Sequence, residues 1–248
     1  ENTSQTIAFN HRSYNTTNRN ALAIKPQGVE IVNTPVYPTQ ENLENINATI
    51  KLKEDRSIDV SSKFVYKGGQ YDTNMALVGL SKKDMEEGLK SKFNNLKFNS
   101  LEISDFNNDK NKAQINYQLQ FVASEYSKKL GDDLFFSVVP FYDFTINTSD
   151  TERKLPFENI FAYHDDYTFE YEAPNGYAFK DLPSKPIEVT SEFGSYKIDF
   201  KLVDNKLKVN RVITINNGTY SKEKYIDYIN FRKKILNSDN TKILISKS

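Results

Sequence analysis

The chain has 248 residues, enough to bury a sizeable core, and its 33 Lys and Arg residues equal its 33 Asp and Glu residues in number. The lack of a basic stripe argues against a nucleic-acid partner, and the lack of a run of about 18 apolar residues predicts no membrane span. The chain has no cysteine, which excludes thiol catalysis and disulfides. Its two histidines, His11 and His164, are too few for a metal centre built from histidines. We therefore expect no cofactor and no metal centre.

Residues 1–35 are polar, rich in Asn and Thr and only weakly periodic, with proline and glycine as punctuation. We interpret them as the end of a preceding domain followed by a linker. The rest of the chain divides into two strand-rich halves, 36–155 and 156–248, which are separated by a polar passage at 147–156, and the alternation becomes clear from Ala48. Each half contains strand pairs followed by one helix. The sequence leaves open whether the halves form one core or two lobes.

Strict alternation of apolar and polar residues predicts three β-hairpins. The first turns at Glu54–Arg56, which is a three-residue loop. The second surrounds Asp105–Asn111, where oxygen-bearing residues are spaced as at the start of a calcium loop. Lys110 stands where such a loop needs glycine, and Asn116 where it needs a bidentate carboxylate, so we interpret this stretch as a solvated hairpin tip.

The third hairpin opens the C-terminal stretch, residues 193–247, and turns at Asp204–Asn205, two residue types that tolerate the left-handed backbone of a tight turn. A closing strand is expected at Lys242–Ser246. The alternation also fixes the register of the hairpin. The predicted cross-strand pairs are Leu202 with Leu207, Phe200 with Val209, Ile198 with Arg211, and Tyr196 with Ile213.

Two short helices accompany these strands. Ser81 and Asp84 have the spacing of a capping box, which predicts a helix start at Ser81. The second helix is predicted from Ser221 to about Asn237, with an apolar stripe that can dock on a sheet. We therefore predict a mostly β fold, a large antiparallel β-sandwich in one or two lobes, with two short peripheral α-helices.

Arg211 is the odd member of an apolar strand face. It could form an anion site, or its stem could lie along apolar surface with the guanidinium in water or on a carboxylate. The densest polar cluster is Tyr163–Tyr167, where His164 lies beside Asp165 and Asp166 and could act as a general base. No nucleophile or oxyanion donor accompanies it, so we interpret the cluster as a loop that enters a strand, with solvated acids.

The 15 Tyr and 17 Phe residues raise the possibility of ligand stacking. Most of them fall on the strand faces that turn toward the core. Tyr14, Tyr37, Tyr71 and Tyr163 fall in predicted loops and are candidates for contact with a glycan or a peptide.

Several C-terminal segments carry a family resemblance. They are NGYAFKDLP at 175–183, FGSY at 193–196, the Arg211 of VNRVITI, and the Tyr225-to-Arg232 segment before KILISK. Together they resemble the C-terminal domain of unknown function of bacterial multidomain transglutaminase-like proteins, and the opening residues resemble the end of the transglutaminase-like domain itself.

That resemblance implies export to the periplasm or cell surface and a papain-like Cys-His-Asp core upstream of this chain. None of the triad carries over, because cysteine is absent and neither histidine lies in a matching motif. We therefore expect a non-catalytic accessory β-sandwich that positions the catalytic domain of the same polypeptide or contacts a cell-envelope protein. The alternative is a glycan- or peptide-binding module that uses loop aromatics.

Overall fold

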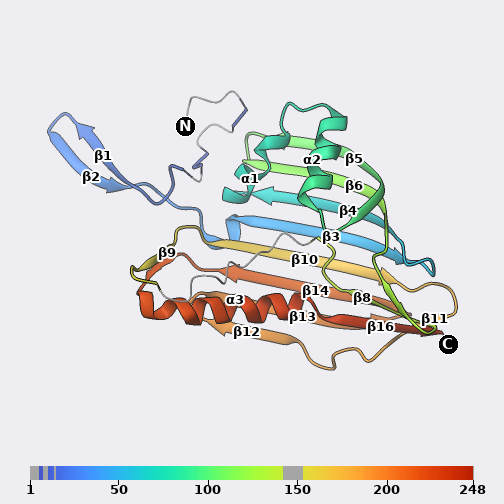
Figure 1. Cartoon of the computed structure of the whole chain (residues 1–248). Helices are drawn as coiled ribbons and strands as arrows, with labels where there is room; N and C mark the ends of the chain where they lie inside the picture. Colours follow the sequence, from blue (N-terminus) through green and yellow to red (C-terminus); the bar gives the residue numbers. More distant parts are fainter. Residues whose placement is uncertain (1–5, 8–10, 14, 142–152, 248) are drawn as a thin grey trace.

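The computed structural model describes residues 6–7, 11–13, 15–141 and 153–247 (Figure 1). Strands make up 51% and helices 18% of the structure, which confirms the predicted mostly β fold. Tyr14 and most of the polar passage at 147–156 lie outside the described residues.

The largest element is an eight-stranded sheet with the order β12-β13-β14-β10-β3-β4-β6-β5. All neighbours in it are antiparallel except β10 and β3, which run parallel and join strands from the two predicted halves in one sheet. The strands are β3 (Leu43–Leu52), β4 (Ile58–Lys67), β5 (Lys97–Asp109), β6 (Gln114–Ser124), β10 (Tyr163–Glu172), β12 (Ile187–Ser191), β13 (Gly194–Val203) and β14 (Lys206–Ile215).

A four-stranded sheet packs against one end of the large sheet. Its order is β11-β16-β8-β7. The ring of Phe136 lies 4.8 Å from that of Tyr171 in the large sheet, and the Tyr171 hydroxyl donates to the Val138 carbonyl at 3.0 Å. This face-to-face contact is consistent with a sandwich. The strands are β7 (Lys128–Leu130), β8 (Asp133–Ser137), β11 (Tyr177–Lys180) and β16 (Lys242–Lys247).

Two helices cover more of the same face of the large sheet (Figure 1). Helix α2 (Lys82–Lys92) packs on β5, and α3 (Tyr225–Asp239) packs on β12 and β13. Leu89 of α2 and Ile235 of α3 belong to one buried cluster with residues from both sheets. The opposite face of the large sheet is mostly polar, because strands such as β3 and β14 alternate buried residues with half-buried or exposed ones that are largely polar.

The predicted register of the C-terminal hairpin is confirmed, whereas the tip predicted at Asp105–Asn111 is wrong, because β5 continues through a bulge to Asp109 and the turn follows it. All four cross-strand pairs between β13 and β14 occur as expected, and Asp204 and Asn205 adopt φ values of 50° and 56°, in the left-handed region that the turn requires. The loop at Glu54–Arg56 closes with a hydrogen bond from Lys53 N to Ser57 O at 3.0 Å, which makes it the predicted three-residue turn.

The helix starts are confirmed in one case and corrected in the other. Ser81 caps α2 by accepting from the Asp84 backbone N–H at 3.2 Å. The second helix starts as a 3-10 turn, η3 (Lys222–Lys224), and the Ser221 side chain makes no cap hydrogen bond. Short turns that the sequence did not predict are η1 (Thr39–Glu41), α1 (Gly69–Thr73) and η2 (Met75–Leu77).

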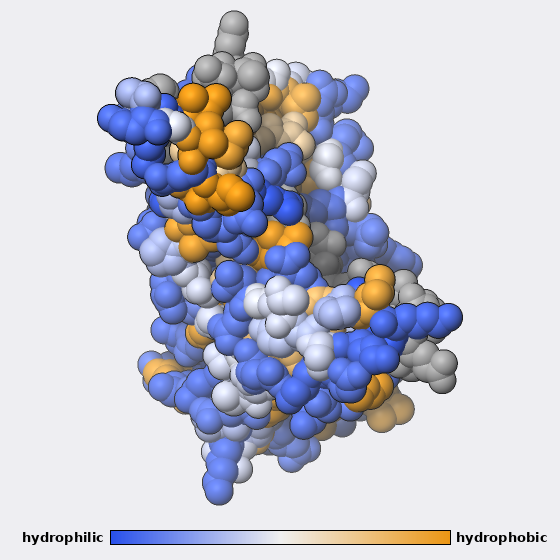
Figure 2. All heavy atoms as spheres, turned by 90° about the vertical axis from the view of Figure 1, so that its left-hand side faces the viewer, coloured by the Kyte–Doolittle hydropathy of each residue, from blue (hydrophilic) through white to orange (hydrophobic). Residues whose placement is uncertain are grey.

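Residues 20–33, expected within a linker, form a separate hairpin of β1 (Asn20–Lys25) and β2 (Gly28–Asn33) that projects from the rest of the chain (Figure 1). One face of this hairpin is apolar and exposed, and Figure 2 shows hydrophobic side chains at this end of the molecule. The residues of the apolar face are Leu22, Ile24, Val29 and Ile31, which pair across the two strands.

One further small sheet pairs β9 (Phe157–Asn159) with β15 (Gly218–Tyr220). None of the helices in the described part of the chain combines the length and the apolar character needed to cross a bilayer.

A candidate ligand-binding cavity

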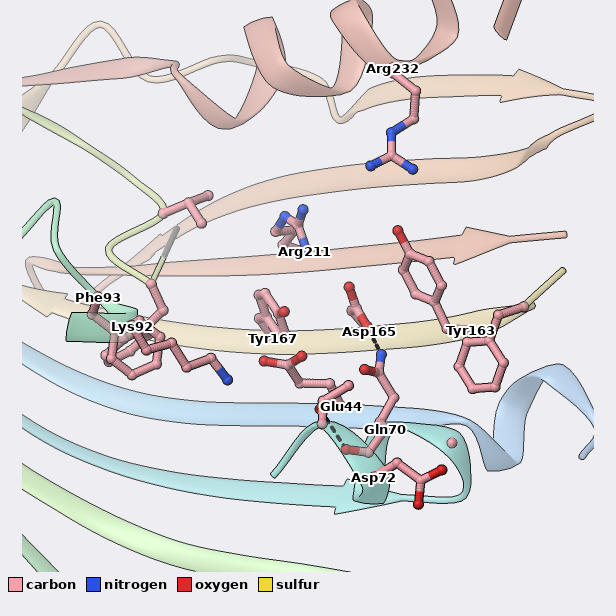
Figure 3. A pocket seen from close by; sticks show the side chains of 15 residues that line it. Glu44, Gln70, Asp72, Lys92, Phe93, Tyr163, Asp165, Tyr167, Arg211 and Arg232 are labelled. Carbon is pink, nitrogen blue, oxygen red and sulfur yellow. Dashed lines mark hydrogen bonds between the residues drawn. The ribbon is translucent and has the colours of Figure 1, made fainter. Parts of the chain in front are cut away.

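A cavity of about 530 Å³ opens on the core face of the large sheet, beneath α3 and beside α1 (Figure 3). Its walls combine aromatic rings with charged groups of both signs. The residues labelled in Figure 3 are Glu44, Gln70, Asp72, Lys92, Phe93, Tyr163, Asp165, Tyr167, Arg211 and Arg232.

The strand register explains why polar groups meet in this part of the core. On β10, alternate residues turn inward, so Asp165 shares a face with Tyr163 and Tyr167. The parallel pairing with β3 places Glu44 opposite Asp165, and the antiparallel pairing with β14 places Arg211 opposite Tyr167. Two carboxyl groups and a guanidinium from three neighbouring strands thus meet at one place.

Arg211 forms a buried ion pair with Asp239, the last residue of α3. Arg211 Nε lies 2.7 Å from Asp239 Oδ1 and Nη2 lies 2.9 Å from Oδ2, with the side chains 6% and 0% exposed. The guanidinium carbon lies 4.8 Å from the centre of the Tyr167 ring and 5.6 Å from that of Tyr196. Of the two interpretations of Arg211, the structure shows a guanidinium on a carboxylate.

The third guanidinium nitrogen, Arg211 Nη1, is buried and has no hydrogen-bond partner among the described residues. Unpaired buried donors are rare in folded proteins, and those of charged groups are the most costly.

Asp165 is buried, which corrects the prediction of a solvated loop. It accepts a hydrogen bond from Gln70 Nε2 at 2.8 Å. Burial raises the pKa of the Asp165 carboxyl well above its ordinary value, and the nearby charge of Glu44 raises it further, against the opposing effect of Arg211 and Arg232. Burial therefore shifts Asp165 toward its protonated form relative to an exposed carboxyl group.

Strand alternation divides the predicted Tyr163–Tyr167 cluster between two faces. Tyr163 lines the cavity, and burial raises the pKa of its hydroxyl to about 12. His164 and Asp166 do not line it. The His164 ring hydrogen-bonds the Thr214 hydroxyl at 3.0 Å, and the Asp166 carbonyl accepts from Asn45 Nδ2 at 2.8 Å.

The other predicted loop aromatics make structural contacts. Tyr71 lies in α1 and is fully buried, and its hydroxyl donates to Asn108 Oδ1 at 2.8 Å, so its ring is not available for stacking with a ligand. The Tyr37 hydroxyl lies 2.8 Å from His11 Nδ1, and His11 Nε2 lies 2.5 Å from Asp72 Oδ1. Both ring nitrogens of His11 are thus occupied.

Sequence reasoning missed Glu44, Lys92 and Arg232. The parity that places Ile46 in the core also places Glu44 there, and Arg232 follows Tyr228 by four residues on the apolar stripe of α3. No comparable signal identifies Lys92, whose ammonium lies 5.1 Å from the centre of the Tyr66 ring. Within the described residues, no group of three or more His, Asp or Glu side chains is arranged to hold a metal ion.

The wall near α1 depends on close packing at Gly69. A Cβ atom at this position would lie 1.6 Å from the Phe161 ring, and Phe161 also lines the cavity. Any larger residue would therefore displace this wall.

Part of the chain is similar to a described family. Residues 132–245 match the family model DUF3858, a Domain of Unknown Function with solved-structure structure. This segment contains Asp165, Arg211 and Arg232 but not Glu44 or Lys92. No curated protein matches the chain.

One solved structure that resembles the chain is described as a "putative protease" from Parabacteroides distasonis ATCC 8503. The identity is 17% and the TM-score 0.37, over 47% of this chain and 24% of that chain. The chain thus corresponds to about a quarter of the length of that protein.

Proposed function

We propose that this chain is a non-catalytic accessory module of a larger exported protein, and that it binds a sugar or a peptide segment in the cavity of Figure 3. The observation that carries the proposal is the cavity itself, where aromatic rings and charges of both signs line about 530 Å³. Sites for small molecules have this size and this combination of apolar walls with a few polar groups.

The chemistry of the lining residues supports binding over catalysis. The described lining residues include neither serine nor cysteine, and both nitrogens of the nearby His11 ring are occupied. The described lining residues therefore do not contain the serine–histidine or cysteine–histidine pair of nucleophilic catalysis. The resemblance to the C-terminal region of transglutaminase-like proteins supports placing catalysis in another domain of the same polypeptide, in the periplasm or at the cell surface.

The test is a screen of the chain on glycan and peptide arrays, followed by affinity measurement for any hit. Tyr163→Ala should weaken binding by at least about tenfold, because stacking on an aromatic ring is a main source of affinity in such a site. Tyr225→Ala is the matched control, since Tyr225 is a half-buried tyrosine of α3 that does not line the cavity. Silent arrays at high protein concentration, or equal affinities of the two variants, would refute the proposal.

A second candidate function, contact with a neighbouring domain, is favoured by the hairpin of β1 and β2. Isolated two-stranded hairpins are marginally stable in water, and exposed apolar patches are characteristic of interaction surfaces. Ile24 and Ile31 are 83% and 75% exposed on its apolar face. Under this proposal the hairpin packs on the transglutaminase-like domain of the same polypeptide and positions it.

Amide hydrogen exchange tests this contact. Exchange in β1 and β2 should be slower in the native polypeptide than in this chain alone, and Ile24→Lys should abolish the difference. Ala23→Lys, on the opposite face of the hairpin and paired with Glu30, should preserve it. Equal exchange rates in the two proteins would exclude the contact.

A further inference from the structure

The hairpin of β1 and β2 is joined to the two larger sheets and their helices, here called the body, by a stem. The stem contains residues 11–13, 15–19 and 34–37, and its two segments are tied together, since Thr34 N donates to Arg19 O at 2.7 Å. The hairpin strands pack mainly on each other, and the hairpin projects from the body in Figure 1. The direction of the hairpin is therefore set by the contacts of its stem.

One buried side chain fastens this stem to the body. The His11 side chain is 0% exposed, with Nε2 at 2.5 Å from Asp72 Oδ1 and Nδ1 at 2.8 Å from the Tyr37 hydroxyl. The Tyr37 oxygen also accepts from the Arg12 backbone N–H at 3.1 Å. An imidazole with its proton on Nε2 satisfies these groups, because it donates to Asp72 and accepts from the Tyr37 hydroxyl. This chain of contacts links both segments of the stem to α1.

Helix α1 is a firm anchor, because it is hydrogen-bonded to residues beside β3 and within β5 and β10. These bonds, each 2.8 Å long, run from Gly69 N to Asn42 Oδ1, from Gln70 Nε2 to Asp165 Oδ1, and from the Tyr71 hydroxyl to Asn108 Oδ1. The Tyr71 ring also meets the His11 ring edge-on, with the ring centres 5.0 Å apart. A stem that is bound to α1 is thus bound to the large sheet.

Elsewhere the stem is packed less closely on the body. A cavity of about 170 Å³ is lined by Tyr37 of the stem and by Phe161 of the body, so close packing does not hold the stem on this side. The Thr6 carbonyl accepts from Asn108 Nδ2 at 3.2 Å, but Thr6 lies upstream of the stem. The contacts of His11 are therefore the main restraint on the direction of the stem.

We propose that the contacts of His11 with Asp72 and Tyr37 form a latch that holds the hairpin in one orientation relative to the body. The latch fixes the direction in which the apolar face of the hairpin points. A neighbouring domain that packs on this face is then held at a fixed angle to the large sheet. This consequence rests on the proposed contact of the hairpin with a neighbouring domain, whereas the latch belongs to this chain and can be measured without a partner.

A distance measured between two spin labels tests the latch. The chain has no cysteine, so two introduced cysteines would be its only labelling sites. Gln27→Cys lies in the exposed turn of the hairpin, and Lys63→Cys lies at an exposed position of β4. Pulsed electron paramagnetic resonance should give a narrow distance distribution for this labelled chain. The additional change His11→Ala should broaden the distribution at least about twofold, because the stem loses its bond to α1.

Two further variants separate the latch from general effects on folding. Tyr37→Phe keeps the ring and removes only the hydroxyl between His11 and the Arg12 backbone, so it should broaden the distribution less than His11→Ala. His164→Ala removes the other histidine, whose ring hydrogen-bonds the Thr214 hydroxyl within the large sheet, and should leave the distribution unchanged. Circular dichroism and thermal melting of each variant check that the body is folded, and Tyr37→Phe decides the test if His11→Ala does not fold.

Three results would overturn the inference. They are a broad distribution in the labelled chain without further change, distributions that stay narrow in both latch variants, and equal broadening by His164→Ala. Slower amide exchange of β1 and β2 in the native polypeptide, together with a narrow distribution in His11→Ala, would leave the domain contact standing and refute only the latch. Equal exchange rates with a broadened His11→Ala distribution would do the reverse.

Discussion

Removing the carboxylate that pairs with Arg211 should cost a large part of the stability of the fold. Asp239 accepts three hydrogen bonds, from Arg211 Nε at 2.7 Å, Arg211 Nη2 at 2.9 Å and the Tyr196 hydroxyl at 2.8 Å. The Asp239 side chain is 0% exposed, so water cannot replace it when the charge is removed. Breaking a buried pair on one side costs about 3–5 kcal/mol.

Asp239→Asn is the direct perturbation, since it preserves size and removes the charge. The expected loss of about 3–5 kcal/mol corresponds to a decrease in Tm of about 6–20 °C for a protein of this length. Urea denaturation of wild type and variant at pH 7, with a check that the slope is unchanged, measures the free energy of unfolding.

A double-mutant cycle tests the physical reason. Arg211→Met with Asp239→Leu removes both charges and should destabilise the chain less than either single change, because no buried charge is left unpaired. The control is Glu188→Gln in the exposed pair with Lys197, whose N–O distance is also 2.7 Å but whose side chains are 60% and 52% exposed. That change should cost less than about 1 kcal/mol.

The reasoning would be refuted if Asp239→Asn cost no more than Glu188→Gln. It would also be refuted if the effects of the two single changes at Arg211 and Asp239 added in the double variant. Either result would mean that burial does not make the free energy of unfolding depend on both charges of this pair being present together.

Burial raises the pKa of Asp165 above its unfolded value, so the stability that its proton contributes is lost as pH rises from the ordinary carboxyl range toward the raised pKa. Thermal melting from about pH 4 to pH 8 should therefore show Asp165→Asn gaining stability relative to wild type as pH rises, and parallel curves would contradict this assignment. Ser81→Ala removes the cap of α2 and should cost about 1 kcal/mol in urea denaturation, whereas Ser91→Ala, whose hydroxyl only bonds back to Glu87 O within the helix, should cost less. Deletion of residues 219–248 removes α3 and also β16, which lies between β11 and β8 in the four-stranded sheet, so the C-terminal half should unfold. A soluble, cooperatively melting product would contradict this expectation.

Local physics was sufficient for the C-terminal hairpin, for the three-residue turn at Glu54–Arg56 and for helix α2. The pairing of Ile198 with Arg211 follows from period-2 alternation and from a turn of two residues that tolerate positive φ, and both signals lie within a few residues of each other. The start of α2 follows from the reach of the Ser81 side chain to Asp84. Such features depend little on distant parts of the chain.

The large sheet could not be assembled from the same signals. Many strands of this chain have similar alternation, so periodicity shows which face of each is buried but not which neighbour it takes. The parallel pairing of β10 with β3 places Asp165 beside Glu44, 121 positions earlier in the chain, and unites the two halves in one sheet. Only the packing of the complete core selects that neighbour.

Asp165 shows where local reasoning and tertiary structure diverge. The inward parity of Tyr167 and Tyr163 applies equally to Asp165, but the cost of burying a carboxylate favoured a solvated loop. The structure offsets that cost with Gln70 from α1 and with the nearby charges of Arg211 and Arg232. The sequence alone determined which strand faces turn inward, and the tertiary structure decided that polar groups on those faces meet around a cavity, because their partners come from distant elements.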